Sequence, residues 1–198
     1  MAVRRILTYP ESFLRTKSDE VRNITGETVK LIDDMVQTMY AAPGVGLAAP
    51  QLGIGERIIV LDVGEPDDDD DLPSEEAAAA EREPGRNLII LINPRVAEGE
   101  GEIVWEEGCL SVIDLRAEVV RAARILVKGW DLDQREVEFE AEGLLAVALQ
   151  HEIDHLEGRL FIDHLSPLKR ELYIKRVRKA LREGRPIARE PRSESDNI

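Results

Sequence analysis

Cysteine is almost missing from this sequence: one of the 198 residues is a cysteine, so the chain cannot form an internal disulfide. This is typical of a reducing compartment, and we expect a cytoplasmic location. No stretch approaches the roughly 18 consecutive apolar residues that a membrane span needs, so no membrane partner is expected. Residues Met1 to Arg5 also lack the apolar core of a signal peptide.

Basic residues are in the minority. The chain has 26 lysines and arginines against 40 aspartates and glutamates, a formal net charge of −14. This balance excludes a protein that coats nucleic acid with its whole surface, and we expect no DNA partner. At 43% hydrophobic, a chain of this length has enough apolar residues for one core. We predict a single domain over residues 1–184 and a disordered tail over residues 185–198.

The charges are concentrated in two segments of opposite sign. Residues 65–86 include ten acidic and two basic residues, a local net charge of −8. We interpret this acidic segment, with its flanks at about residues 64–87, as a solvated loop inserted between two strands; the alternative is a cation or partner site. Residues 166–192, the basic segment, include ten basic and three acidic residues, a local net charge of +7.

The basic segment has the pattern of a C-terminal helix. Ser166 and Pro167 are typical of an N-cap and the first helical residue, and Gly184 of a residue that ends a helix. An approximately helical stripe of apolar residues predicts the packed face: Leu168, Leu172, Ile174, Val177 and Leu181. The basic residues that we expect to face solvent are Lys169, Lys175, Arg178, Lys179 and Arg182.

Hydrophobic periodicity predicts a mixed fold. Apolar residues between Val29 and Met39 recur at helical spacing, and residues 144–156 form a second, strongly apolar helix. Residues 136–142 alternate between glutamate and apolar residues, as in a half-buried strand, and residues 119–130 also suggest a strand. Strands that cluster before one internal helix favour an α+β fold. We predict mostly antiparallel strands around that helix, which carries an HExxH motif, and a C-terminal helix.

That motif is the sequence His151-Glu152-Ile153-Asp154-His155. Positions i and i+4 share a helix face, so His151 and His155 can bind one metal ion while Glu152 lies beside it as a candidate base. The alternative is a pair of ordinary helix histidines beside an incidental acid. Burial argues against it, because these polar groups are costly to bury unless they are paired or bind a metal. Asp154 is interpreted either as a residue that orients a ligand histidine or as a surface acid.

A catalytic metal site needs a third protein ligand, and its identity separates two kinds of hydrolase. In HExxH metallopeptidases it is a downstream His or Glu, but Phe161 occupies that histidine position and Glu171 lies in the basic segment. Cys109, within EGCLS, is either a buried structural cysteine or the third ligand, since a thiolate with two imidazoles suits zinc or ferrous iron. A closed structural site would need a fourth ligand, and His164 is the one spare histidine.

A third segment, GVGLAAPQ at residues 44–51, combines alternating glycines with a terminal amide. The glycines permit close approach of the backbone to a ligand, and the Gln51 amide can donate to an oxygen. The segment lacks the spacing of a phosphate-binding loop. Taken alone, it is interpreted as a tight connection between a helix and a strand.

Together, the three segments resemble the bacterial peptide deformylases. That family carries the motifs GφGφAAxQ, EGCLS and HEφDH, in which φ is hydrophobic. The corresponding stretches here are GVGLAAPQ at residues 44–51, EGCLS at residues 107–111 and HEIDH at residues 151–155. The resemblance covers about residues 3–180. Two departures concern the shape of the cleft: the acidic segment is longer than the usual connection, and Ile113 stands where many members have proline.

The resemblance implies a single catalytic domain that removes the formyl group from formylmethionyl nascent polypeptides and releases formate; a metallopeptidase is the alternative. It implies Fe²⁺ as the cofactor, with Zn²⁺ or Ni²⁺ in purified protein. Glu152 would be the general base, and Gln51 and the Leu110 N–H would stabilise the oxyanion. The implied metal ligands are Cys109, His151 and His155. The implied substrate-binding residues are Gly46, through its backbone, and the methionine-pocket residues Val45, Trp105, Leu144, Val147 and Ala148.

The basic segment also predicts a partner. By the resemblance, the substrate emerges from the ribosome, whose surface is rich in RNA phosphate. A local charge of +7 lets this part of an acidic chain dock on an anionic surface. The alternative is a solvated amphipathic helix whose apolar stripe packs on the domain.

Overall fold

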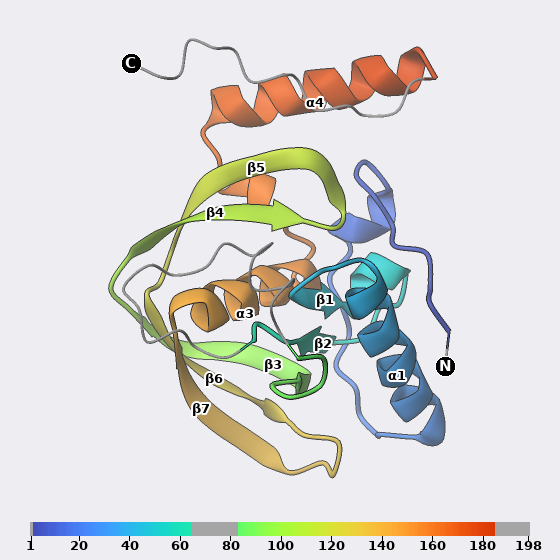
Figure 1. The fold of residues 1–198 in the computed structure, drawn as a ribbon, viewed down its shortest axis with the longest axis vertical. Helices are drawn as coiled ribbons and strands as arrows, with labels where there is room; N and C mark the ends of the chain where they lie inside the picture. The colour runs from blue at the N-terminus through green and yellow to red at the C-terminus, as the bar shows by residue number, and fades with distance from the viewer. Residues whose placement is uncertain (1, 65–82, 185–198) are drawn as a thin grey trace.

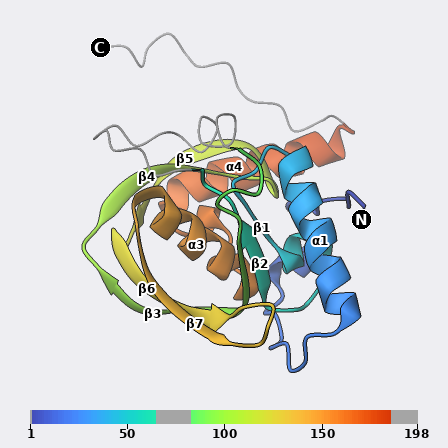
Figure 2. The ribbon, with the colours of Figure 1, turned by 60° about the horizontal axis from the view of Figure 1, so that its bottom comes forward.

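One helix, α3, lies between two antiparallel sheets (Figures 1 and 2). The computed structural model describes residues 2–64 and 83–184; most of the acidic segment and the C-terminal tail, with our predictions for them, lie outside the described residues. The elements in chain order are η1 (Ser12–Arg15), α1 (Gly26–Ala41), β1 (Gly46–Ala48), η2 (Ala49–Leu52), β2 (Ile58–Leu61), β3 (Ile89–Glu100), β4 (Ile103–Cys109), β5 (Val112–Arg121), β6 (Arg124–Trp130), β7 (Glu136–Glu142), α3 (Gly143–Leu156), η3 (Phe161–Asp163) and α4 (Pro167–Arg182).

The larger sheet has five strands in the order β1-β2-β3-β6-β7, and the smaller sheet is the β4-β5 hairpin. All the paired strands in these two sheets are antiparallel. In Figure 2, α3 lies in the hollow between the curved larger sheet and the hairpin, and α1 lies at the side of β1 and β2. The predicted α+β fold, with mostly antiparallel strands around the HExxH helix and a C-terminal helix, is confirmed.

The strand β2 separates two parts of the core. Ile59 and Leu61 belong to the apolar cluster that includes α3, whereas Ile58 and Val60 belong to the cluster that includes α1. All four side chains are fully buried. A strand covered on both faces needs apolar residues at every position, which explains the continuous apolar run that the sequence shows here.

The helix α1 follows its predicted periodicity with one exception. Leu31, Ile32, Met35 and Met39 are buried, whereas Val29 is 41% exposed. Val29 lies two positions from Leu31, which is about 200° around a helix. Because its side chain is exposed, the placement of Val29 on the predicted apolar face is wrong.

The predicted strand over residues 119–130 is two strands. β5 ends at Arg121 in the hairpin, and β6 begins at Arg124 in the larger sheet. At the break, the Gln150 side chain of α3 accepts a hydrogen bond from the Ala122 N–H at 3.1 Å and donates to the Ala122 carbonyl oxygen at 3.0 Å. The amide thus replaces the strand partners that the backbone loses where the chain passes between sheets.

The helix α4 begins and ends as predicted, but of the five apolar residues predicted to pack, Val177 alone is buried. Its N-cap is Ser166, whose side chain accepts from the Lys169 N–H, and Pro167 is its first residue. Leu168, Leu172 and Leu181 are 68%, 58% and 55% exposed, so the prediction that they pack inwards is wrong. The five predicted solvent-facing basic residues are all exposed.

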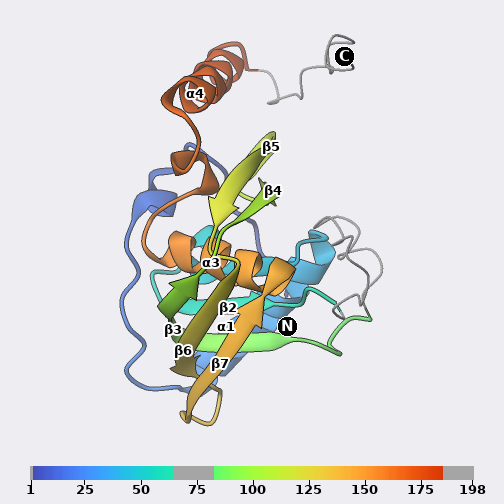
Figure 3. The same ribbon diagram turned by 90° about the vertical axis from the view of Figure 1, so that its left-hand side faces the viewer.

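The packed face of α4 consists of Tyr173, Val177 and Ala180. The Tyr173 hydroxyl donates to the carbonyl oxygen of Ile113, at 3.2 Å, near the start of β5. The prediction of the packed face considered only aliphatic residues and therefore left out Tyr173. A tyrosine can pack as well, because its large apolar ring can be buried while its hydroxyl makes a hydrogen bond. Figures 1 and 3 show α4 at the edge of the molecule, beyond the hairpin and away from α3.

Gly158 fixes the end of α3 against the N-terminal part of the chain. Its φ is +70°, a left-handed conformation, and a Cβ atom on it would lie 2.6 Å from the Arg15 carbonyl oxygen. Nearby, the Ser18 N–H donates to the Leu156 carbonyl oxygen at 2.8 Å. The helix that carries the HExxH motif therefore ends on a backbone contact that leaves no room for a side chain.

We predict that Gly158→Ala lowers the free energy of unfolding by about 2–4 kcal/mol, because it adds both left-handed strain and a collision with backbone. Gly184→Ala is the matched control: its φ of +61° is similar, but no atom of the described residues lies within 4 Å of the added Cβ. The control should lose about 1 kcal/mol. Urea unfolding followed by circular dichroism measures both, and equal losses would show that the collision is relieved by small backbone shifts.

Candidate metal centre

Three side chains that could bind a metal ion come together from two elements. Cys109 ends β4, and His151 and His155 lie one turn apart on α3. Their ligating atoms all lie within 4.8 Å of one another, and the Cys109 Sγ is 3.3 Å from the His155 Nε2. Both histidines are buried. The structure thus brings together the three residues that are predicted to be metal ligands.

The group fits a divalent cation such as Zn²⁺ or Fe²⁺. With bonds of about 2.3 Å to sulfur and about 2.05 Å to nitrogen, a tetrahedral site places neighbouring S and N ligands about 3.6 Å apart, close to the observed spacing. The Nδ1 of His151 lies 2.8 Å from the Glu107 Oε2, which leaves its Nε2 for a metal. Among the described residues the group has three members, so a fourth position stays open, as in catalytic sites.

A buried ion pair sets the charge beside His151. Glu107 is fully buried, and Arg121 donates from Nε and Nη2 to its two carboxylate oxygens at 2.6 and 3.0 Å. Burial alone would raise the pKa of Glu107, but the hydrogen bonds from His151 and Arg121 outweigh burial and lower this pKa to about 2. Glu107 is therefore a carboxylate near neutral pH, and it accepts the Nδ1–H of His151.

The two histidines have opposite electrostatic surroundings. Burial lowers the pKa of His155, and the neighbouring His151 lowers it further. For His151, burial also acts to lower the pKa, but Cys109 and Glu107 together raise it well above its ordinary value. His155 thus presents a neutral imidazole to a metal, whereas a metal that binds His151 must displace a proton.

Asp154 differs from both of its sequence interpretations. It is not a surface acid, and it does not contact a ligand histidine; it pairs with Arg121 at 2.6 Å and with His164 at 2.7 Å. The carboxylate that orients His151 is that of Glu107, which the sequence shows only as part of EGCLS. Nothing in the sequence indicates that Arg121 is the ion-pair partner of Glu107 and Asp154. His164 is not part of the three-residue metal group.

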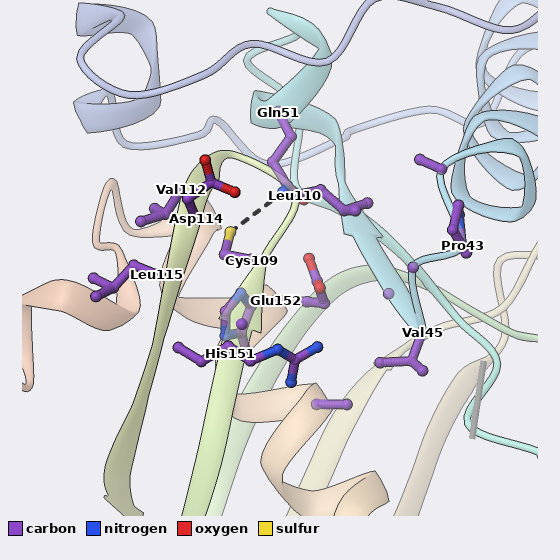
Figure 4. Close-up of a pocket in the computed structure, with 16 residues that line it drawn as sticks. Pro43, Val45, Gln51, Cys109, Leu110, Val112, Asp114, Leu115, His151 and Glu152 are labelled. Atoms are coloured by element: carbon purple, nitrogen blue, oxygen red, sulfur yellow. Dashed lines mark hydrogen bonds between the residues drawn. The ribbon is translucent and has the colours of Figure 1, made fainter. Parts of the chain in front are cut away.

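Gln51 is held so that its amide nitrogen faces Cys109. Its Oε1 accepts the Ala48 N–H at 2.8 Å, which turns Nε2 towards the Ser111 hydroxyl at 3.1 Å and the Cys109 Sγ at 3.8 Å (Figure 4). Leu110 lines the same pocket. The two residues predicted to supply the oxyanion donors, Gln51 and Leu110, therefore line the pocket that contains Cys109 and His151.

Glu152 reaches the pocket because Gly46 has no side chain. A Cβ atom on Gly46 would lie 2.5 Å from the Glu152 Oε1, so the carboxylate lies directly against the backbone of β1. Glu152 is 5% exposed and lines the pocket with Cys109 and His151 (Figure 4). The predicted base thus shares one cavity with two of the predicted ligands, and the third, His155, contacts the Cys109 Sγ.

The pocket itself has a volume of about 380 Å³. Of the six residues predicted to bind substrate, three line it: Val45, Gly46 and Ala148. The other three form a buried apolar cluster with Val45: Trp105, Leu144 and Val147. The cluster therefore meets the pocket at Val45. The lining also includes four β5 residues that the sequence analysis did not single out: Val112, Asp114, Leu115 and Arg116.

Comparison with known proteins points to one family. The model of the polypeptide deformylase family matches residues 3–171. A peptide deformylase of Syntrophobacter fumaroxidans is 48% identical over 93% of this chain and 99% of its own. A solved peptide deformylase from Legionella pneumophila is 40% identical, with a TM-score of 0.76 over 96% of this chain and 100% of that one. A Met-Ala-Ser-bound class I type b peptide deformylase from Acinetobacter baumannii is 33% identical, with a TM-score of 0.72 over 83% of this chain and 99% of that one.

Proposed function

The chain belongs to the polypeptide deformylase family, and on this premise we propose how its residues act. It is a metal-dependent hydrolase that removes the formyl group from formylmethionyl nascent polypeptides and releases formate. Two observations support the residue assignment: Cys109, His151 and His155 form one possible metal-binding group, and two of its members, Cys109 and His151, line a pocket with Glu152. The metallopeptidase alternative is not supported, because the third residue of the metal group is a cysteine from a strand and not a downstream His or Glu.

The roles proposed here are those that the resemblance implies, and the positions of the residues in the pocket support them. A bound divalent cation would supply Lewis acidity towards a water and the formyl oxygen. Glu152 accepts a proton as water attacks the formyl carbon and passes it to the departing amine. Gln51 Nε2 and the Leu110 N–H hold the oxyanion, and the loss of one such donor typically raises the barrier by about 2.7–4 kcal/mol. Gly46 holds the peptide backbone.

The methionine side chain lies against Val45 and the apolar cluster behind it. This cluster offers apolar side chains and no charged group, which suits a thioether side chain. The relative from Acinetobacter baumannii, solved with Met-Ala-Ser, supports a ligand that begins with methionine.

We predict that Glu152→Gln keeps one metal per chain while turnover falls by about 10²-fold or more, because the amide keeps the shape but cannot take a proton. Formate release from formyl-Met-Ala-Ser and metal content measure the two effects. Glu171→Gln, on the exposed part of α4, is the control and should leave both unchanged. Near-normal turnover of the metal-loaded Glu152 variant would remove Glu152 from this role.

The metal that we propose for the cell is Fe²⁺, with Zn²⁺ or Ni²⁺ in purified protein. A thiolate with two imidazoles suits each of these ions. The ion that is bound therefore depends on which metal is available to the protein. Cys109 is partly exposed and lines the pocket, where small oxidants can reach it. Thiolates oxidise stepwise, first to a reversible sulfenic acid and then to sulfinic and sulfonic acids that are generally irreversible.

We predict that the iron form loses activity in air or dilute peroxide and that the nickel form survives longer. The reason is that a thiolate on ferrous iron is open to oxidation together with its metal. Formate release is followed over time for both forms at one peroxide dose. Equal lifetimes would contradict iron-dependent inactivation.

We further propose that the basic segment docks on ribosomal RNA and that the enzyme works in the cytoplasm. Five exposed basic residues on α4 offer charge to phosphate, and three exposed leucines beside them offer apolar contact. In the described ranges, the helices are too short or too polar to cross a membrane. Docking would hold the enzyme where formylated chains emerge.

We predict that replacing Lys175, Arg178, Lys179 and Arg182 with Glu weakens ribosome co-sedimentation at low salt. Counterion release drives such contacts, so binding of the unsubstituted chain should itself fall steeply as salt rises. Turnover of a short formyl peptide should not change, because α4 lies outside the pocket.

The matched control makes the same four charge reversals away from α4. Suitable exposed residues are Arg22, Lys30, Arg95 and Arg135. This control has the same net charge as the α4 variant, so it separates a local patch from the overall charge. Equal co-sedimentation of the two variants would rule out docking through α4.

A further inference from the structure

A chain of polar groups runs from the metal group to the surface. It passes from His151 to Glu107, then to Arg121, Asp154 and His164. The side chains of Glu107, Arg121 and Asp154 are 0%, 4% and 14% exposed, whereas that of His164 is 32% exposed. His164 is therefore the outer end of the chain, and the function proposed so far does not use it.

The contacts determine which atom of His164 carries hydrogen. The His164 Nε2 lies 2.7 Å from the Asp154 Oδ2. The same carboxylate pairs with the guanidinium of Arg121, so it is ionised and can only accept hydrogen bonds. The Nε2 must therefore be an N–H. Arg121 Nη1 donates to the same Oδ2 at 2.6 Å, so two donors converge on one oxygen.

The backbone of His164 is fixed by the element that also supports His151. Its N–H donates to the Phe161 carbonyl oxygen at 3.0 Å, which closes η3. The Phe161 ring stacks on the His151 ring, with centroids 6.1 Å apart. The short helix η3 therefore contacts His151 directly through the Phe161 ring. It also fixes the backbone of His164, the residue at the outer end of the polar chain that leads to His151.

We propose that His164 is a positioning residue of the metal centre. By donating to Asp154 it keeps that carboxylate on Arg121, and Arg121 in turn holds Glu107 in line with the Nδ1–H of His151. Without the donor, Asp154 loses one of its two partners, and water gains access to a buried ion pair whose strength depends on excluding water. This inference rests on the proposed metal site. The alternative is an ordinary surface ion pair, which would have no effect on the metal.

The test measures metal release rather than catalysis. Nickel-loaded enzyme is mixed with a chromophoric chelator, and release is timed for the unsubstituted chain, His164→Ala and His164→Gln. The alanine variant should release nickel at least about twofold faster, though less than the 10- to 100-fold typical of a residue bonded directly to a ligand. The glutamine variant keeps an N–H donor of similar reach and should release nickel like the unsubstituted chain.

Lys17→Ala is the matched control. It removes an exposed 2.7 Å ion pair with Glu157, just past the end of the same helix α3 and unconnected to His151. Its release rate should equal that of the unsubstituted chain. A change of less than twofold for His164→Ala, or an equal change for Lys17→Ala, would overturn the proposal.

A second comparison tests the route. In an Asp154→Ala background the polar chain is already cut, so His164→Ala should cause no further acceleration. Additive acceleration would show that His164 acts by another path and would overturn the proposal. Formate release by the unsubstituted chain is measured separately, so a failure of the proposed hydrolysis is distinguishable from a failure of this inference.

Discussion

The buried carboxylate of Glu107 is the constraint on which the metal centre depends. It belongs to β4, while its partners, Arg121 and His151, belong to β5 and α3. A carboxylate with no exposed surface needs both partners, and removing one partner of a buried pair typically costs about 3–5 kcal/mol. The contacts that satisfy this charge also dock the hairpin on α3. They thereby place Cys109, two residues further along β4, beside the histidines.

The parts of the site that the sequence predicts are those fixed by local geometry. Two histidines at i and i+4 share a face on any helix, and the apolar residues over 144–156 predict the helix that is found there. The close contact at Gly46 is also predicted from local sequence, because a glycine in a run of small residues permits another group to approach the backbone. In the structure that group is the Glu152 carboxylate. The prediction that Cys109 lies beside the two histidines came from the resemblance to family motifs, because the spacing of these residues in the sequence does not indicate it.

The parts that the sequence does not predict depend on how distant elements meet. Arg121 lies 14 positions from Glu107 and 43 from His164, and no local pattern marks an arginine at a strand end as a buried ion-pair partner. The break between β5 and β6 likewise depends on Gln150 of α3. On α4, helical periodicity correctly predicts a helix but cannot say which face meets the domain. Tyr173 decides that through its bond to the hairpin.

The ligand set links the metal to folding. Cys109 and His155 are 46 positions apart and come from elements that meet only in the folded chain. In the unfolded chain, only the two histidines, four positions apart in sequence, are close enough to bind one cation together. A cation that binds all three residues therefore binds the folded chain more tightly and stabilises it by mass action. At a free concentration one hundred times its dissociation constant, such a ligand adds about 2.7 kcal/mol to the free energy of unfolding. If these three residues bind the proposed metal, its supply would raise the stability of the folded chain as well as the active fraction.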